Sequence, residues 1–435
     1  MKIKFSHADI PPVEVPDANL LAVLAPREIE HPRPLADLTE DALEHPIDAA
    51  RLEKLVSPST KVLLLVDDIT RQTPAAGLLP AVFRRLQEGG APNQNVKILI
   101  AAGTHSHMTR EELEKKLGPG TLAQYAVALH HWKEEDHLRH IGALPDGTPV
   151  KVNRMLGEAD LVIGLGQIVP HRVMGFTGGS SIVQPGVSGP AVTGHTHWLS
   201  ALYPGAEIIG FADNPVRREV EQIAKLAGLR YIINVVMDRS ERVIHVVAGD
   251  PVAAHHQGAG YSRDIFGVSQ PEYADIVIAE SYPADYDLWQ AAKGIYASEL
   301  SVKKGGVVIL VTQCYHGVSS EHPEVERLGY PGVEEVKRLV AEKKITDLVA
   351  AAHLAHVGRV IKDRATGIMV SKWIPPDVQR HIGFEPASTP QEALGMALAA
   401  SGPKSRVAVL QQGGHVLPLV EGAEARSPQP AGAQP

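Results

Sequence analysis

Histidines cluster around a glycine-rich segment, residues 163–198, which holds the side chains best suited to chemistry in this sequence. His171 stands near its start, and His195 and His197 stand at its end. Imidazole titrates near neutral pH, so these residues can be acids, bases, metal ligands or ordinary hydrogen-bonded side chains. The glycines between them let backbone N–H groups approach a ligand, and such turns commonly bind anions. The segment therefore indicates a ligand site.

Charged and titratable residues also follow predicted strands, at the sheet edge where ligands gather in α/β folds. These residues are Asp68, Arg71, His105 and His171. Two histidines placed in this way can act as opposed acid and base. Arg71 can hold a carboxylate through two parallel hydrogen bonds, and Lys293 can add a second cation. Each of these residues also has a purely structural interpretation: Asp68 and Arg71 can form a local ion pair, and Lys293 can be a solvated helix residue. Their shared position favours one common site.

Other histidine and glycine patterns carry less information. His195-Thr196-His197 is a weak metal-ligand pair, because residues two apart point the same way in a strand but not in a helix. No HExxH or CxxC motif is present, which argues against a zinc hydrolase. Gly164-Leu165-Gly166 does not open a full dinucleotide-binding fingerprint. The pairs His130-His131 and His255-His256 have no chemical context and are interpreted as structural or surface residues.

Strands alternate with helical segments in the first part of the chain. Long apolar runs at residues 61–66, 96–102 and 159–163 suit strands buried on both faces of a parallel sheet. Residues 78–87 have helical spacing, and Thr109-Arg110-Glu111-Glu112 is a capping box that starts another helix. We expect further strands at 208–211 and 231–237 and a helix at 214–228. The alternation predicts a doubly wound α/β sheet with right-handed crossovers.

A second α/β pattern begins near residue 269. Strands are expected at 274–279, 307–312, 368–370 and 406–410, and helices at 288–302, 333–343 and 345–356. The predicted fold class is thus α/β, with two domains of mostly parallel sheets and the active site in the cleft between them. The expected boundaries are 1–268 for the N-terminal domain, 269–421 for the C-terminal domain and 422–435 for a disordered tail.

Composition excludes several classes of protein. A chain of 435 residues is long enough for two or three domains with their own cores. The formal charge of −8 argues against a nucleic-acid-binding surface. The single cysteine, Cys314, excludes an intramolecular disulfide framework and suits a reducing compartment. No segment is long and apolar enough to span a membrane. We expect a cytoplasmic protein that binds neither nucleic acid nor membrane.

Several short motifs, in this order and spacing, resemble the lactate racemase family over residues 40 to 415, roughly. Members of this family use a nickel-pincer nucleotide. The motifs are Asp68-Ile69-Thr70-Arg71, Gly103-Thr104-His105, His171, Gly175-Phe176-Thr177-Gly178-Gly179, Pro185-Gly186, His197, Ile233-Asn234-Val235-Val236, Ala248-Gly249-Asp250 and Gln290-Ala291-Ala292-Lys293-Gly294.

The resemblance implies a role for each matching residue. It implies that His105 and His171 are the acid/base pair, that His197 binds nickel, that Arg71 and Lys293 hold the substrate carboxylate, and that Gln290 and Asp68 assist them. The residues that it places at the cofactor are Asp68, Thr70, Gly178, Gly179, Ser180, Ser181, Pro185 and Gly186. In such enzymes hydride leaves C2 of a 2-hydroxy acid for the cofactor while a histidine takes the hydroxyl proton. The implied partners are a small 2-hydroxy acid and the proteins that make the cofactor.

Ser181 departs from the family pattern, which has a lysine here that tethers the cofactor covalently. A hydroxyl cannot form that linkage, so we expect a non-covalently bound cofactor. A family tryptophan of the second domain also has no counterpart near residues 347–349. A non-catalytic protein that binds or stores the cofactor is the alternative that Ser181 suggests.

Substrate choice is predicted from two polar residues beside the presumed bases, Arg172 and His107. If Arg172 faces the pocket, it can bind a second carboxylate through its guanidinium fork. We therefore predict a short hydroxy diacid such as malate in preference to lactate. A sugar acid, epimerised at C2, is the alternative.

Overall fold

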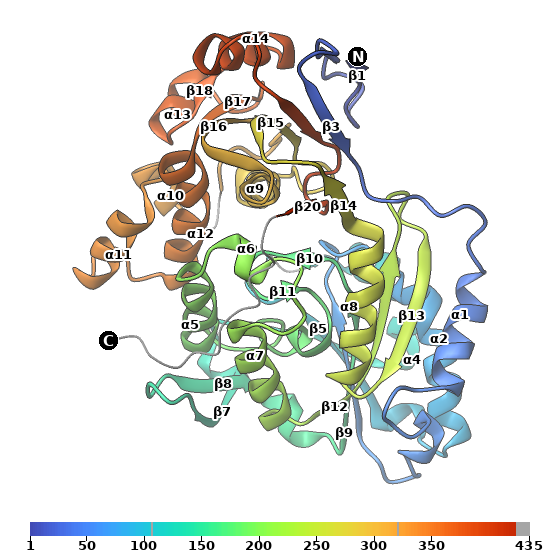
Figure 1. The fold of residues 1–435 in the computed structure, drawn as a ribbon. Helices are drawn as coiled ribbons and strands as arrows, with labels where there is room; N and C mark the ends of the chain where they lie inside the picture. Colours follow the sequence, from blue (N-terminus) through green and yellow to red (C-terminus); the bar gives the residue numbers. More distant parts are fainter. Residues whose placement is uncertain (106–107, 320–321, 423–435) are drawn as a thin grey trace.

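Two α/β domains make up the chain, each built on a six-stranded sheet. The computed structural model describes residues 1–105, 108–319 and 322–422. Figure 1 shows the first domain, largely blue to green, next to the second, largely yellow to red. The predicted fold class, α/β with mostly parallel sheets, is confirmed.

The first sheet has the strand order β13-β12-β9-β4-β5-β6. Every neighbouring pair is parallel except β12 with β13. The central strands are apolar runs buried along their whole length, as a parallel sheet covered on both faces requires. The strands are β4 (Val62–Asp67), β5 (Val96–Ala101), β6 (Ala126–Leu129), β9 (Leu161–Gln167), β12 (Leu229–Met237) and β13 (Val243–Gly249).

Helices cover both faces of this sheet. Side chains alternate along β4, so Leu64 packs with Leu78 in one core, whereas Leu63 packs with Ala254 in the other. This two-sided burial is the doubly wound arrangement that the sequence predicts. The helices are α1 (Leu35–Glu44), α2 (Ala75–Glu88), α3 (Arg110–Leu117), α4 (Thr121–Gln124), α5 (Pro190–Ala201), α6 (Gly205–Ile208), α7 (Pro215–Leu226) and α8 (Ala253–Phe266).

The second sheet has the order β18-β17-β16-β15-β19-β3, and all its neighbouring pairs are parallel. Its strands are β3 (Leu20–Leu24), β15 (Ala274–Glu280), β16 (Val302–Val311), β17 (Ala365–Val370), β18 (Glu385–Pro386) and β19 (Val407–Leu410). Its helices are α9 (Leu288–Glu299), α10 (Glu324–Leu328), α11 (Val333–Ala341), α12 (Leu348–Gly358), α13 (Pro376–His381) and α14 (Pro390–Ser401).

Two expectations about chain organisation need correction. The N-terminal strand β3 is an edge strand of the second sheet, with Leu24 opposite Leu410, so the chain starts in the second domain. The expected 1–268 domain is therefore not one continuous unit. Residues 208–211, expected as a strand, start with the last residue of the short helix α6 and form no strand. Of the expected tail, only Gly422 lies within the described residues.

Helix α5 of the first domain packs against α12 of the second (Figure 1). A Cβ on Gly194 would lie 3.1 Å from Cβ of Leu348, so the missing side chain lets the two helices approach closely. Ser200 Oγ lies 3.0 Å from Nε2 of His356, and Arg359 donates to the Ala201 carbonyl at 2.6 Å. These contacts fix α5, which carries His197, against the second domain.

Short strands complete the described chain. They are β1 (Lys2–Ile3), β2 (Val13–Glu14), β7 (Leu138–Ala143), β8 (Pro149–Asn153), β10 (Pro170–His171), β11 (Gly175–Phe176), β14 (Gly267–Gln270) and β20 (Leu417–Val420).

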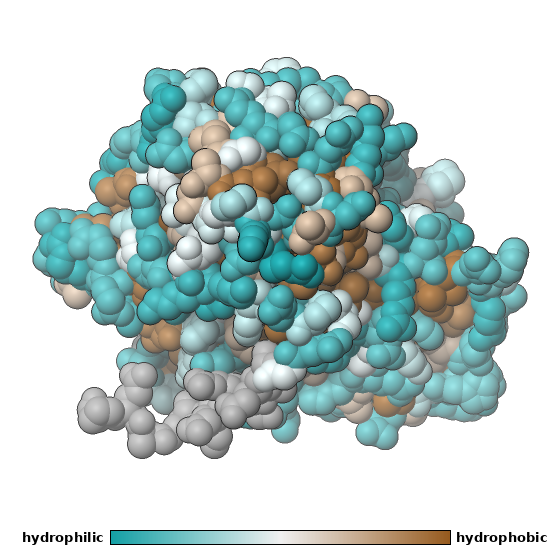
Figure 2. Space-filling model, turned by 45° about the horizontal axis from the view of Figure 1, so that its top comes forward, coloured by the Kyte–Doolittle hydropathy of each residue, from teal (hydrophilic) through white to brown (hydrophobic). Residues whose placement is uncertain are grey.

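Figure 2 shows one face of the molecule, where hydrophilic residues prevail around a limited hydrophobic strip. No helix in the described part of the chain combines the length and apolar character that a membrane span needs.

Candidate active site

Asp68 and His105 meet at the carboxyl end of the first sheet. Strands β4 and β5 are parallel neighbours, with Asp67 opposite Ala101, so the loops that follow them leave the sheet side by side. There His105 Nδ1 lies 2.6 Å from Asp68 Oδ2. The backbone N–H of Thr70 donates to the other carboxylate oxygen at 2.9 Å. Strand adjacency therefore builds an aspartate–histidine couple.

The Asp68 carboxylate fixes the tautomer of His105. Burial alone would raise the pKa of Asp68, but His105 and then Arg71 outweigh it, and the pKa lies well below its ordinary value. An ionised carboxylate only accepts hydrogen bonds, so Nδ1 of His105 carries the proton and donates it. Nε2 is left with its lone pair. This arrangement orients a general base and stabilises the imidazolium that forms when the base takes a proton.

His171 is the last residue of β10 and pairs with Gly175, the first residue of β11, across a tight turn. The Val173 N–H donates to Nδ1 of His171 at 3.4 Å. Burial, followed by the positive charges of Arg71 and Lys293, holds the pKa of His171 well below its ordinary value. The imidazole is therefore uncharged at neutral pH, and both cations lie close enough to act on it.

Arg71 and Lys293 bring positive charge from the two domains to one place. Lys293 lies on α9 and donates to Gln290 Oε1 at 2.9 Å. The N-cap residue Asp287 accepts a hydrogen bond from the Gln290 N–H, which fixes the start of the helix. Burial, followed by the charge of Arg71, lowers the pKa of Lys293 to about 7. Two cations this close favour an anion between them, as a substrate carboxylate would be.

The lowered pKa of Lys293 predicts an alkaline loss of substrate binding. Lys293 is charged below its pKa of about 7 and neutral above it, so kcat/KM for an anionic substrate should fall as pH rises through 7. The expected slope is about tenfold per pH unit. Lys293→Arg keeps its charge over this range, because arginine has a pKa above about 12, and should remove this decline. Identical pH profiles for wild type and Lys293→Arg would contradict the assignment.

Lys116 anchors the backbone of Arg71 from within the first domain. Its buried ammonium donates to the Arg71 carbonyl at 2.8 Å and lies 2.8 Å from Oδ1 of Asp67. Thr73 donates to the other oxygen of Asp67. The Arg71 loop is therefore attached to the sheet through a buried ion pair.

Removing Lys116 should destabilise the protein strongly. Lys116→Met leaves Asp67 buried without its cation, which typically costs about 3–5 kcal/mol of unfolding free energy. Burial raises the pKa of Asp67, so protonation should relieve part of the loss, and the deficit should be smaller at pH 5 than at pH 8. Denaturant unfolding at pH 5 and at pH 8 measures the free energy of unfolding and its dependence on pH. The exposed neighbour Lys115→Met is the control, with an expected change within about 0.5 kcal/mol; equal losses for the two variants would contradict the account.

His197 has one ring nitrogen left for a metal. Its Nδ1 lies 2.8 Å from the Thr193 carbonyl, one turn earlier in α5. A carbonyl only accepts, so Nδ1 donates and Nε2 keeps its lone pair, the form in which imidazole binds metals. Burial lowers the pKa of His197 to about 4, so no proton competes at neutral pH. His195 points elsewhere, with Nε2 at 2.9 Å from Glu219 and Nδ1 at 3.0 Å from Asp146.

The expected cofactor-binding glycines form a tight turn beside the His105 loop. Gly178 and Gly179 have φ values of 77° and 58°, in the left-handed region that favours glycine. Gly179 N–H donates to Asn234 Oδ1 at 2.7 Å. Gly103 N–H donates to the Gly186 carbonyl at 2.9 Å, which joins the loop after β5 to the glycine-rich segment.

The serines and the proline of this segment line the same turn. Ser180 is buried and Ser181 is half-buried. Gly186 N–H donates to the Ser181 carbonyl at 3.1 Å. Pro185 is a close neighbour of Gly103, where an added Cβ would lie 3.8 Å from its Cγ. Ser181, at which the resemblance implies a lysine, thus has a short side chain within the 3-10 turn of residues 179–182.

Arg172 does not face this site, contrary to expectation. Its guanidinium is buried, donates to the carbonyls of Ser200 at 3.2 Å and Tyr203 at 2.7 Å, and lies 3.9 Å from Glu299. Arg172 is the first residue of the turn that joins β10 to β11, and its side chain is directed to the carbonyls at the end of α5. The prediction that Arg172 holds a second carboxylate is wrong. His107, the other residue offered for this role, lies outside the described residues.

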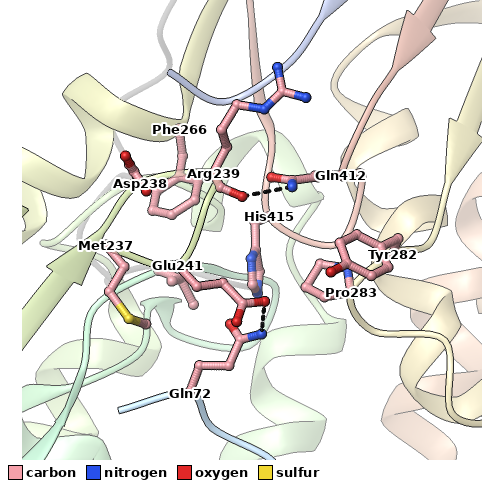
Figure 3. Close-up of a pocket in the computed structure, with 11 residues that line it drawn as sticks. Gln72, Met237, Asp238, Arg239, Glu241, Phe266, Tyr282, Pro283, Gln412 and His415 are labelled. Atoms are coloured by element: carbon pink, nitrogen blue, oxygen red, sulfur yellow. Dashed lines mark hydrogen bonds between the residues drawn. The ribbon is translucent and has the colours of Figure 1, made fainter. Parts of the chain in front are cut away.

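His415 belongs to this neighbourhood and was not among the predicted residues. Burial, followed by Lys293 and Arg71, lowers its pKa to about 3. Figure 3 shows His415 in a pocket between the domains, with Gln72 and Glu241 on one side and Tyr282 on the other. A glycine pair directly before His415, just after a predicted strand, is the signal that could have identified it.

His322 and Asp347 of the second domain were also missed. Both lie close enough to His197 to affect its pKa, His322 lowering it and Asp347 raising it. His322 Nδ1 lies 3.4 Å from Asp347 Oδ2, and its ring stacks on Trp289 at 3.8 Å between centroids. This group forms the second-domain side of the region around His197.

Comparison with known proteins covers most of the chain. Residues 7–208 match the lactate racemase N-terminal domain, and residues 269–417 match the lactate racemase C-terminal domain. The lactate racemase of Lactiplantibacillus plantarum is 30% identical over 384 residues, 87% of this chain and 89% of its own. That of Thermoanaerobacterium thermosaccharolyticum is 32% identical over 288 residues, 66% of this chain and 67% of its own.

Solved structures share the whole architecture. The lactate racemase apoprotein from T. thermosaccharolyticum superposes with a TM-score of 0.86 at 26% identity, covering 96% of this chain and 99% of its own. A protein from Thermotoga maritima has a TM-score of 0.72 at 23% identity, covering 91% and 100%, which shows a likeness of fold alone.

Proposed function

Because the chain belongs to the lactate racemase family, we propose that it interconverts the C2 enantiomers of a short 2-hydroxy acid with a nickel-pincer nucleotide as cofactor. Family membership supports the coarser statement, a 2-hydroxy-acid racemase. The observation that carries the proposal is the convergence of His105, His171 and His197 with two cations from opposite domains.

The chain supplies acid/base groups suited to both enantiomers. The C2 proton of a hydroxy acid is barely acidic, so its removal as a proton would need a costly carbanion. When bound, the cofactor supplies a hydride acceptor that avoids this cost. Nε2 of His105, freed by the Asp68 hydrogen bond, can take the hydroxyl proton. His171, kept uncharged by burial and by the nearby cations, can do so for the opposite enantiomer. Arg71 and Lys293 hold the carboxylate meanwhile.

The residues present fit the cofactor in one testable respect, the donor chemistry of His197. Its Nε2 lone pair suits nickel, because imidazole is a favourable ligand for that ion. Protein made together with the cofactor-producing enzymes should contain about one nickel per chain at this site. A metal-free preparation with full activity would overturn the proposal.

Ser181 predicts a cofactor that is held without a covalent bond. Denaturing mass spectrometry of active protein should give the bare chain mass, whereas native mass spectrometry should show nickel and nucleotide added. Reversible contacts also mean that dilution or chelation should reduce activity. Ser181→Ala is the matched control, because losing one hydroxyl should leave both masses unchanged apart from the substitution. A covalent adduct on the wild-type chain under denaturing conditions would refute the prediction.

Malate is our specific substrate proposal, now supported by Arg71 and Lys293 and no longer by Arg172. Arg172 is engaged elsewhere, but Arg71 and Lys293 place two positive charges on one site, which suits the two negative charges of a diacid better than the single charge of lactate. Assays of D- and L-malate beside D- and L-lactate test this. Malate should have the higher kcat/KM, and Lys293→Gln should reduce malate use more than lactate use. Faster turnover of lactate would reject malate and leave the racemase proposal intact.

A cofactor-binding protein without catalysis is the second candidate, favoured by Ser181 alone. It predicts tight binding of the nucleotide and no change in optical rotation for any 2-hydroxy acid. The Asp68–His105 couple argues against it, because a storage protein needs no oriented base.

A further inference from the structure

His255 presents a buried nitrogen lone pair beneath the glycine turn. Its Nε2 lies 3.0 Å from the Thr177 carbonyl, and an added Cβ on Gly179 would lie 2.8 Å from its ring. Because a carbonyl only accepts, Nε2 donates and Nδ1 keeps its lone pair. The residue is 1% exposed, and no donor among the described residues reaches Nδ1. A buried acceptor of this kind calls for a partner.

Glu221 and His256 converge on the same place. One ligand atom from each of Glu221, His255 and His256 lies within 4.8 Å of the others. Glu221 Oε1 is 4.0 Å from His256 Nε2 and, within the described chain, is buried without a hydrogen-bond partner. Helices α7 and α8 thus aim a carboxylate and two imidazoles at one point, and two of the three ligand groups lack a partner.

Charged residues of both signs surround this point. Asp213 and Asp250 are close enough to Glu221 to raise its pKa, after burial, which is the largest cause. Arg217 opposes them, but its guanidinium is directed at the carbonyls of Phe176 and Gly178. Asp213 also pairs with Arg218 at 2.6 Å, so charges of both signs lie close to the cluster. The case for a cation therefore rests on the two atoms that lack a hydrogen-bond partner within the described chain, Glu221 Oε1 and His255 Nδ1.

We propose that Glu221, His255 and His256 form a second metal site, separate from His197, for zinc or a similar divalent transition-metal ion. Two nitrogens and one oxygen are the donor set that such ions accept, with water in the remaining position. Ligand atoms around tetrahedral zinc lie about 3.3 Å apart, and the His256 side chain, 45% exposed, is free to close the difference. The ion would join α7 to α8 and, through the His255 ring, fix Thr177 at the start of the glycine turn.

This assignment changes the interpretation of the His255-His256 pair, which the sequence indicated to be structural. It differs from the group of His322, Glu324 and Asp347, which belongs to the region around His197. The site does not depend on the proposed function, because it needs neither the nucleotide nor the substrate.

Zinc titration of chain made without the cofactor-producing enzymes tests the proposal. After removal of metal with a chelator, wild type should bind one zinc that His197→Ala retains. His256→Ala and Glu221→Gln should each weaken this binding at least tenfold, whereas the exposed His140→Ala should not. Zinc should raise Tm in wild type and His197→Ala but not in His256→Ala, and cobalt should give the absorption bands of a tetrahedral ion.

Two results would overturn it. The first is that all zinc bound by wild type is lost in His197→Ala. The second is that Glu221→Gln and His256→Ala bind zinc with the affinity of wild type. Because His256 is exposed, its alanine variant should fold normally, which circular dichroism verifies, so weak binding by that variant reports on the ligand itself.

Discussion

Replacing His105 by alanine should lower kcat for racemisation by about 10²–10⁴-fold, the usual contribution of a positioned general base. The loss should be equal for the two enantiomers in kcat/KM, because their free energies are identical and the equilibrium constant must stay at one. Asp68→Asn should lower kcat in the same direction, since an amide can donate to Nδ1 and so favour the wrong tautomer of His105.

Nickel content and cofactor mass are the controls for these variants. His105 is assigned to neither the metal nor the nucleotide, so His105→Ala should keep its nickel while losing turnover. Asp68 is also assigned to the cofactor, so the kcat of Asp68→Asn is compared per bound nickel. His105→Ala with more than a tenth of wild-type kcat would contradict its role as the base. Loss of nickel in proportion to activity would instead show that the couple holds the cofactor.

His197→Ala should abolish both retained nickel and activity. The side chain is the one ligand that the resemblance assigns to the metal, and its Nε2 lone pair is fixed by the Thr193 hydrogen bond. We expect at least a 10²-fold loss of affinity, because even residues that only support a metal ligand contribute about 10–100-fold. Metal analysis after gel filtration measures the nickel that each variant retains.

His195→Ala is the matched control, two residues earlier in the same helix. Its imidazole pairs with Glu219 and Asp146 on the other side of α5, so its removal should leave nickel and turnover near wild type. Equal nickel in wild type and His197→Ala, or a greater loss in His195→Ala, would reject the assignment of the metal ligand.

The sequence was sufficient to predict the central strands of both sheets and the meeting of Asp68 with His105. Strands buried on both faces are continuous apolar runs, so β4, β5 and β9 stand out from the rest of the chain. Parallel strands end at the same edge, which brings the residues that follow β4 and β5 together without further information. The resemblance added roles that these patterns alone left open.

Contacts between distant segments were not predictable. Strand β3 is short and only partly buried, and nothing in its residues names β19 as its partner. His415 reaches Arg71 and Lys293 only because the domains meet. The direction of the Arg172 side chain was not predictable either. Arg172 follows His171 directly, yet it points to the carbonyls at the end of α5. Adjacency in sequence does not give a shared direction where a strand passes into a turn.

The central claim is that hydride leaves C2 and returns to it. The most direct test is racemisation of C2-deuterated L-malate and L-lactate in ordinary water, by protein made with the cofactor-producing enzymes. The account predicts that the D enantiomer forms with deuterium still at C2, because a transferred hydride does not exchange with solvent. Formation of the D enantiomer with hydrogen at C2 would show proton abstraction, and no interconversion of either acid would show that the chain is not a racemase of these substrates; both results would contradict the account.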